Sequence, residues 1–256
     1  EDVSYGLRQN GNRTPLVLID ATPSGTAHVP ADATLGETWQ ALAFDDAEWT
    51  PVTSAVGYDE ATTYDSHFGA GGDLDNTINN VNTTLYLRFP FSVSESGSIS
   101  ELTLKMKYDD GFAAFLNGVR VADANAPGAL SWNSDASAQH SDGEAQGLVD
   151  FDISLHAHLL VNGPNLLAIH GLNDSITSSD MLISPELHAV RVTDPSIGSS
   201  GFLGRPSPGG LNGDTFGGWD LTWTTTGGKV TITDCKTAAS GELVIPDTIE
   251  GNPVTS

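Results

Sequence analysis

The 256-residue chain contains one cysteine, Cys235, and few basic side chains. A single cysteine excludes an intramolecular disulfide and a zinc site built from several thiolates. Lysine and arginine together number 10, against 33 aspartate and glutamate residues, which gives a formal net charge of -23. Because such a charge repels phosphate groups and anionic membrane surfaces, we expect no nucleic acid partner.

Long apolar runs are also missing from the sequence. No stretch approaches the 18 apolar residues that a membrane-spanning helix needs, so membrane insertion is not expected. The first residues, EDVSYGLRQ, lack the basic and then apolar pattern of a signal peptide, which predicts a mature or excised segment. Low lysine content with abundant Gly, Thr, Ser, Asn and Asp is typical of secreted bacterial β proteins, so we expect an extracellular or cell-surface location.

Patterns of amphipathic helices are not apparent, and short apolar runs bounded by Gly, Pro, Asn, Asp or Ser take their place. Asn117-Gly118 separates two of these runs and predicts a type I′ hairpin, because both positions of that turn need positive φ. The runs indicate an all-β protein, an antiparallel β-sandwich with long polar connections at residues 59–83 and 123–146. The predicted strands are residues 16–19, 85–93, 102–108, 112–116, 119–122, 148–153, 165–172 and 186–192.

The composition changes near residue 192. Residues 193–218 are dense in Gly, Pro and Ser and predict a linker, so we expect residues 1–192 to form the first domain. Residues 219–256 are Thr-rich, with the strand-like pieces KVTIT and ELVIP. They resemble the start of a bacterial surface-antigen-type leucine-rich repeat. Since about three repeats are needed to bury a continuous core, this partial β-rich segment should have little stability of its own.

Several ordered motifs resemble those of galactose-binding-domain-like jelly rolls, which are attached to many glycoside hydrolases and bacterial surface proteins. The first is WQALAFDDAEWTPVTSAVGYDE at residues 39–60, and NTTLYLRFPFSV, YDDGFAAFLNGVRVA, WNSDASAQH, NLLAIHGLN and SSDMLISPEL follow in order. Asp59 and Ala47 depart from the family pattern, which has Gly and Ser there. The resemblance covers residues 14–192 and implies a jelly-roll β-sandwich, while its function has to be argued from the site itself.

Residues 129–144, ALSWNSDASAQHSDGE, form the best candidate platform for a sugar. A sugar has apolar C–H faces ringed by hydroxyl groups, so its site combines an aromatic plane with amide or carboxylate partners. Trp132 with Asn133, Asp135 and His140 supplies this combination, although Trp132 could equally cover the edge of the sandwich. Secondary candidates for sugar contact are Tyr58, Tyr64 and Arg88.

Acidic residues offer two further candidate sites. Asp109 and Asp110 precede the predicted hairpin, and neighbouring strand residues point to opposite faces, which argues against a glycosidase pair. A turn in which Asp binds backbone N–H groups is favoured there, with contact to a sugar or Ca²⁺ as the alternative. The loop at residues 65–80 places hard oxygen ligands between glycines, which predicts either a solvated loop or a Ca²⁺ site. Its ligands would be Asp65, Asp73, Asp75 and Asn76.

The catalytic and nucleotide motifs GxSxG, HExxH, the P-loop and GxGxxG are absent from the sequence, which counts against hydrolase, zinc protease and nucleotide functions. The sequence therefore predicts a noncatalytic carbohydrate-binding module with Ca²⁺ as its cofactor. We expect it to act as a monomer within a larger multidomain chain and to hold an enzyme or cell surface near a polysaccharide. The alternative is an adhesion or structural spacer module that binds a protein or no ligand.

Overall fold

The computed structural model describes residues 12–193, 221–227, 229–235, 248–249 and 252–253. The chain divides into two units, Arg13–Thr193 and a second one that combines Glu1–Asn12 with Asp194–Ser256. Apart from Thr193, the predicted linker lies outside the described residues. No helix in the described part has the length and apolar character needed to cross a membrane.

The described residues of the second unit form two antiparallel strand pairs. β13 (Leu221–Thr226) pairs with β14 (Lys229–Cys235), and β15 (Thr248–Ile249) pairs with β16 (Asn252–Pro253). The piece KVTIT lies in β14, whereas ELVIP lies outside the described residues. The leucine-rich repeat resemblance therefore stays a prediction.

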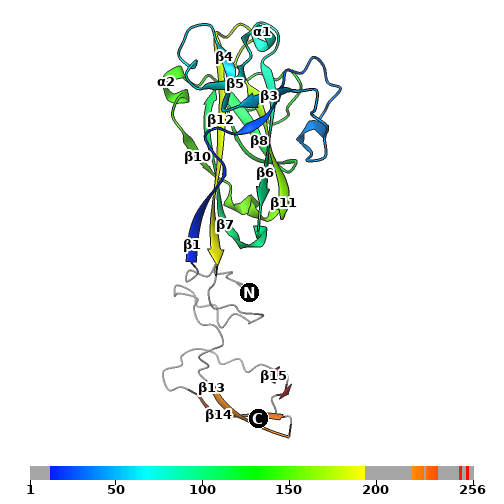
Figure 1. The fold of residues 1–256 in the computed structure, drawn as a ribbon, viewed down its shortest axis with the longest axis vertical. Coiled ribbons are helices and arrows are strands. Elements are labelled where there is room, and N and C mark those ends of the chain that lie inside the picture. The colour runs from blue at the N-terminus through cyan, green and yellow to red at the C-terminus, as the bar shows by residue number, and fades with distance from the viewer. Residues whose placement is uncertain (1–11, 194–220, 228, 236–247, 250–251, 254–256) are drawn as a thin grey trace. The chain divides into compact units, whose positions relative to one another are not determined.

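Two six-stranded sheets build the first unit, which confirms the predicted all-β sandwich (Figure 1). The first sheet has the order β10 (Val149–Asp152), β7 (Ile99–Asp109), β12 (Asp180–Thr193), β4 (Ala55–Asp59) and β5 (Phe68–Asp73), with β1 (Asn12–Ile19) also paired to β12. The second has the order β3 (Thr50–Thr53), β2 (Ser24–His28), β6 (Thr84–Val93), β11 (Gly163–Leu172), β8 (Gly111–Leu116) and β9 (Val119–Ala124).

Helices of the described residues are one or two turns long and lie in the connections. They are α1 (Asp75–Ile78), α2 (Asp142–Ala145), η1 (Thr38–Gln40), η2 (Ser96–Ser98) and η3 (Ser154–Leu159). The sequence shows no helical periodicity because both packed layers of this unit are sheets, and no helix packs against the core as a layer.

The core lies between the facing sheets and follows from the period of two along each strand. On β7, Leu102, Leu104 and Met106 are fully buried, while the alternate residues Lys105 and Lys107 remain partly exposed on the outer face. Each buried side chain of this size contributes about 1.5–3 kcal/mol through removal of apolar surface from water. All eight predicted strands fall on strands of the two sheets.

Asn117 and Gly118 form the hairpin turn between β8 and β9, as predicted. Their φ angles are 51° and 87°, both in the left-handed region that a type I′ turn requires. The Asn117 side chain also fixes the neighbouring strand, since its Oδ1 accepts the N–H of Leu166 at 2.9 Å and its Nδ2 donates to the Leu159 carbonyl at 2.9 Å. The turn is therefore anchored to β11.

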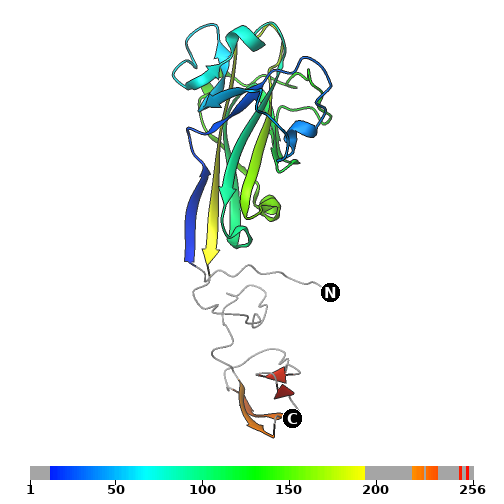
Figure 2. The same cartoon turned by 45° about the vertical axis from the view of Figure 1, so that its right-hand side comes forward.

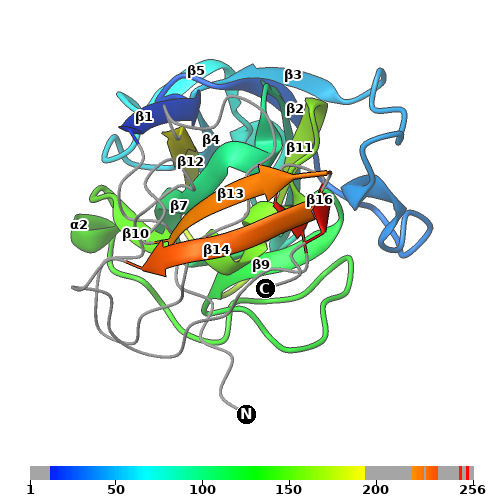
Figure 3. The same cartoon turned by 90° about the horizontal axis from the view of Figure 1, so that it is seen from below.

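One edge of the sandwich is closed by a corner at Ser54, whose φ is 63°. The chain leaves β3 in one sheet and continues as β4 in the other, and β5 lies beside both strands (Figure 3). Gly69 allows this approach, because a Cβ there would lie 2.2 Å from the Thr53 carbonyl oxygen. Residues 59–83, expected to be a long polar connection, therefore also contain a strand, β5, because their glycines permit a close strand contact.

The outer face of the second sheet is covered by residues 29–49. Trp39 lies in this segment, is almost fully buried, and stacks on Tyr86 of β6 with ring centroids 4.2 Å apart. Arg88 of β6 ties the segment down: its Nε donates to Asp46 Oδ2 at 2.8 Å and its Nη1 donates to the carbonyl of Ala41 at 2.9 Å. This face of the sandwich is therefore filled by the protein's own aromatic side chains.

Candidate functional site

Residues 125–148 connect β9 in one sheet to β10 in the other and lie across the end of the sandwich where β7 ends (Figure 2). This long connection is ordered by its main chain. The N–H of Ala136 donates to the Asn173 carbonyl at 2.8 Å, and the N–H of Ser137 donates to the Asn125 carbonyl at 2.7 Å. The predicted sugar platform thus has a fixed backbone.

Trp132 lies half-buried on this connection, with exposed Asn133 and Asp135 beside it. Its carbonyl accepts a hydrogen bond from Asn82 Nδ2 at 3.0 Å. The carbonyl of Ser134 accepts the hydroxyls of Thr83 and Thr84, each at 3.1 Å. Among the residues that the structure describes, the Trp132 indole forms neither a hydrogen bond nor a ring contact. The indole nitrogen is therefore free to donate to a partner, and part of the side chain is exposed.

Asp110 and His140 have structural roles. Asp110 is 4% exposed, and its two carboxylate oxygens accept the N–H groups of His140 and Asp174, each at 2.9 Å. The His140 ring stacks on Tyr108 at 4.3 Å, and its Nδ1 donates to the Tyr108 carbonyl at 2.7 Å. The turn interpretation of Asp110 fits this geometry, and burial removes the surface that a sugar contact at Asp110 would need.

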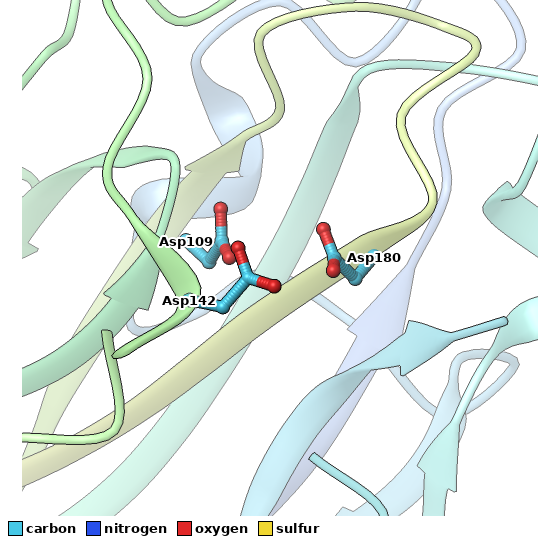
Figure 4. A group of neighbouring side chains, drawn as sticks. All are labelled: Asp109, Asp142 and Asp180. Atoms are coloured by element: carbon cyan, nitrogen blue, oxygen red, sulfur yellow. The ribbon is translucent and has the colours of Figure 1, made fainter. Parts of the chain in front are cut away.

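Asp109 belongs to a different group of side chains. It is 2% exposed at the end of β7 and accepts a hydrogen bond from the Tyr64 hydroxyl. Asp142 of α2 and Asp180 at the start of β12 converge on it, with one carboxylate oxygen of each residue within 4.8 Å of the others (Figure 4). Three elements that are far apart in the sequence therefore bring three acids to one place.

Burial and mutual repulsion disfavour full ionisation of this group. Burial raises the pKa of the Asp109 carboxyl to about 8, and the charges of Asp110 and Asp180 add to that effect. The pKa of Asp180 is raised to about 6 by burial and then by neighbouring acids, including Asp142. Because a bound cation would offset the same repulsion, Asp109, Asp142 and Asp180 are the described acids that could hold a metal ion.

The residues expected to bind Ca²⁺ lie elsewhere and do not form such a group. Asp65, Asp73 and Asn76 are exposed. Asp73 accepts the N–H of Asp75 at 3.1 Å, and Asp75 accepts the Nδ2 of Asn79 at 2.9 Å, so both side chains stabilise the start of α1. Within the described chain, the convergent acids come instead from β7, α2 and β12. Their sequence separation explains why inspection of a single loop missed Asp142 and Asp180.

The secondary candidates for sugar contact, Tyr58, Tyr64 and Arg88, are buried. The Tyr58 hydroxyl donates to the Ser178 carbonyl at 2.8 Å and lies in the core at the end of β4. Tyr64 supports Asp109, and Arg88 fixes residues 29–49. The structure therefore corrects these three assignments: burial leaves their side chains without the exposed surface that a sugar contact requires.

Comparisons with known proteins give similarity to solved structures alone. No protein-family model and no curated protein matches the chain. A β-glucuronidase of an uncultured Clostridium species has a TM-score of 0.41 and 11% identity, over 75% of this chain and 31% of that chain. A Lactobacillus rhamnosus β-glucuronidase has a TM-score of 0.41 and 13% identity, over 73% and 30% of the two chains. Bacteroides uniformis β-glucuronidase 2 has a TM-score of 0.41 and 14% identity, over 70% and 18%. The chain spans less than a third of the length of these three proteins.

Proposed function

We propose that the first unit is a noncatalytic carbohydrate-binding module of a secreted or cell-surface protein. The observation that carries this proposal is the half-buried indole of Trp132, which has no hydrogen bond or ring contact with the described residues, on a connection whose backbone is fixed by hydrogen bonds. Such a module holds its parent protein close to a polysaccharide and so raises the local concentration of the two.

The surroundings of Trp132 suit a sugar for two physical reasons. An indole plane packs against the apolar C–H face of a pyranose ring, while the amide of Asn133 and the carboxylate of Asp135 are exposed to bind its hydroxyls. A connection that is already ordered loses little conformational entropy on binding. Because one aromatic platform is a small contact, we expect micromolar or weaker affinity, on the order of -8 kcal/mol or less favourable. A neutral or basic glycan fits the net charge of -23 better than a polyanion.

The acid group supports a binding role more than a hydrolytic one. A glycosidase places its two carboxyl groups about 5–9.5 Å apart, on either side of the scissile bond. The oxygens of Asp109, Asp142 and Asp180 lie within 4.8 Å of one another, and Asp109 is occupied by Tyr64. Oxygens this close can share one cation, and Asp109, at 2% exposed, lacks the accessible surface that a sugar would need.

Calcium is the metal that we assign to these three acids. Ca²⁺ binds carboxylate oxygens at about 2.3–2.6 Å, so two ligands on one ion are separated by at most about 5 Å. The separations within the group meet that limit. A bound ion at this position would join α2 to β7 and β12 and so stabilise the connection that carries Trp132.

Affinity-gel retardation on a panel of polysaccharides, with calcium or with chelator, tests the proposal. We expect at least one neutral polysaccharide to retard the protein and Trp132→Ala to abolish that retardation. Leu155→Ala is the matched control, because Leu155 is 90% exposed and lies on η3, which packs against the opposite end of β7. Equal retardation of the Trp132→Ala variant would refute the platform, and no retention on any polysaccharide in either condition would favour the spacer function.

A further inference from the structure

The Asn82 side chain lies where three connections of the sandwich meet. Asn82 precedes β6, is 6% exposed, and its amide forms four hydrogen bonds with main-chain groups. Its Nδ2 donates to the carbonyl of Pro30 at 2.7 Å and to the carbonyl of Trp132 at 3.0 Å. Its Oδ1 accepts the N–H of Thr83 at 2.8 Å and the N–H of Thr84 at 3.2 Å. Both donors and both lone pairs of the amide are therefore in use.

Trp132 depends on this amide more than its neighbours in the connection do. Among the described residues, Trp132 has one hydrogen bond, which is the bond from Asn82 to its carbonyl. The chain is next held at Ser134, whose carbonyl accepts two threonine hydroxyls at 3.1 Å each, and at Ala136, whose N–H donates to the Asn173 carbonyl at 2.8 Å. Of the described contacts, the Asn82 amide is therefore the one that fixes residue 132 itself against the rest of the sandwich.

Asn165 of β11 is a buried asparagine with the same set of hydrogen bonds, paired near the far end of β6. Its Nδ2 donates to the carbonyls of Val161 at 2.8 Å and Gly163 at 2.9 Å. Its Oδ1 accepts the Val161 N–H at 2.9 Å and the Nδ2 of Asn117 at 2.8 Å. None of these bonds reaches residues 125–148. Asn165 therefore shows what a buried asparagine contributes to the fold alone.

We propose that Asn82 is a positioning residue for the sugar site, because its amide holds the main chain of Trp132 in the arrangement that receives a sugar. This inference rests on the carbohydrate proposal. A group that is already fixed loses little conformational entropy on binding, whereas a group that the ligand must immobilise costs affinity. Loss of the Asn82 donors transfers that cost to the sugar, so we expect the affinity to fall by about tenfold.

Asn82→Asp tests this role without a ligand. The carboxylate keeps the size and the acceptor of the amide, but an oxygen replaces the donor and repels the carbonyls of Pro30 and Trp132. Asn165→Asp is the matched control, because it adds the same charge and also removes donors to two carbonyls. NMR follows the indole N–H resonance of Trp132, assigned by its loss in Trp132→Phe. We expect Asn82→Asp to shift or broaden this resonance and Asn165→Asp to leave it in place, while both variants retain the amide resonances of β7.

Affinity-gel retardation gives the second measurement, on a polysaccharide that retards the unmodified protein. We expect Asn82→Asp to weaken binding by about tenfold and Asn165→Asp to weaken it by less than about twofold. Should either variant fail to fold, Asn82→Ser and Asn165→Ser repeat the comparison. A serine at position 82 lacks the amide donors, and its hydroxyl can still accept a nearby main-chain N–H.

The two measurements separate positioning from folding. An unchanged Trp132 resonance in Asn82→Asp, or equal changes in the Asn82 and Asn165 variants, overturns the proposal in favour of a folding role. A changed resonance with unchanged affinity overturns the role in sugar binding. If the unmodified protein binds no polysaccharide, the carbohydrate proposal fails, and the resonance still decides whether Asn82 fixes Trp132.

Discussion

Asp109 and Asp110 are adjacent in the chain and differ in what surrounds their carboxylates. Asp110 accepts two backbone N–H groups, which satisfy both of its buried carboxylate oxygens. Asp109 has one hydroxyl donor and two acids beside it. The sequence pattern identified the pair and favoured a turn in which Asp accepts backbone N–H groups. Asp110 has this role. The environment of Asp109 depends on residues from α2 and β12, so no local pattern could reveal it.

Asp109→Asn should stabilise the protein in chelator and remove its stabilisation by calcium. In chelator, the unfolded carboxyl ionises near its ordinary pKa, whereas the folded one keeps its proton up to about pH 8. The folded state therefore binds more protons between about pH 4 and 8, and the contribution of Asp109 to stability falls as the pH rises through that window. The unfolding free energy of the variant should exceed that of the unmodified protein by about 2–5 kcal/mol at pH 8 and by little at pH 4.

Calcium should narrow that difference. At 100 times its dissociation constant, a ligand that binds only the folded state stabilises it by about 2.7 kcal/mol, and Asp109→Asn should lose this gain. Thermal melts at pH 8 in calcium and in chelator measure both effects. Asp135→Asn, at an exposed position, is the control. The assignment fails if calcium raises the melting temperature of the Asp109 variant as much as that of the unmodified protein.

Residues 29–49 show how one element can decide which surface of a sandwich is available. The segment places Trp39 over Tyr86 and thereby fills the outer face of the second sheet. Arg88 binds it through Asp46 and three main-chain carbonyls, and is 3% exposed. This segment therefore leaves the connections and the outer face of the other sheet as the surfaces that a ligand could reach.

Arg88→Met should destabilise the protein and release this segment. Loss of one partner of a buried ion pair costs about 3–5 kcal/mol, because Asp46 and the carbonyls lose their donors. Denaturant unfolding measures the loss of stability. Release of the segment is detected by thermolysin cleavage, because the chain has no lysine or arginine between Arg13 and Arg88 and trypsin therefore cannot cut residues 29–49. Arg120→Met is the control, since its pair with Asp123 is largely exposed and should cost about 1 kcal/mol or less. Equal losses in the two variants would contradict the anchoring role of Arg88.

Elements with strong period-two patterns could be predicted from the sequence, and elements made by close contact could not. Leu102, Leu104 and Met106 alternate with polar residues, so β7 was identifiable. β5 has the sequence FGAGGD, which is typical of a loop, and its strand geometry depends on the carbonyl of Thr53 beside Gly69. Trp132 was identifiable as a candidate because it lies in a polar connection. Burial of Tyr58 and Arg88 was not, since each lies in a strand whose facing layer the sequence does not specify.

The whole molecule carries a charge large enough to affect its stability. With 33 acidic and 10 basic residues, the folded chain repels itself at neutral pH. Five of the six lysine and arginine residues in the described part of the sandwich are paired with acids, which leaves most of the acids without a cation. Stability should therefore depend on screening by salt.

Sodium chloride should raise the melting temperature at pH 7 in the presence of chelator. Increasing the ionic strength from about 0.01 M to above 0.1 M shortens the Debye length from about 30 Å to 10 Å or less and weakens the repulsion between distant acids. A gain of about 1 kcal/mol corresponds to about 2–4 °C for a unit of this size. Calorimetry in sodium chloride measures the change, and choline chloride at equal ionic strength separates screening from sodium binding. A melting temperature that stays constant or falls would contradict the expected self-repulsion.

The pairing of β1 with β12 determines where the sandwich joins the rest of a polypeptide. The start of β1 and the end of β12 lie side by side at one end of the unit, and β7 reaches Asp109 at the other end (Figures 1 and 2). The chain therefore enters and leaves this unit at the same end. Trp132 and the three acids lie toward the opposite end of the unit, away from these two strand ends.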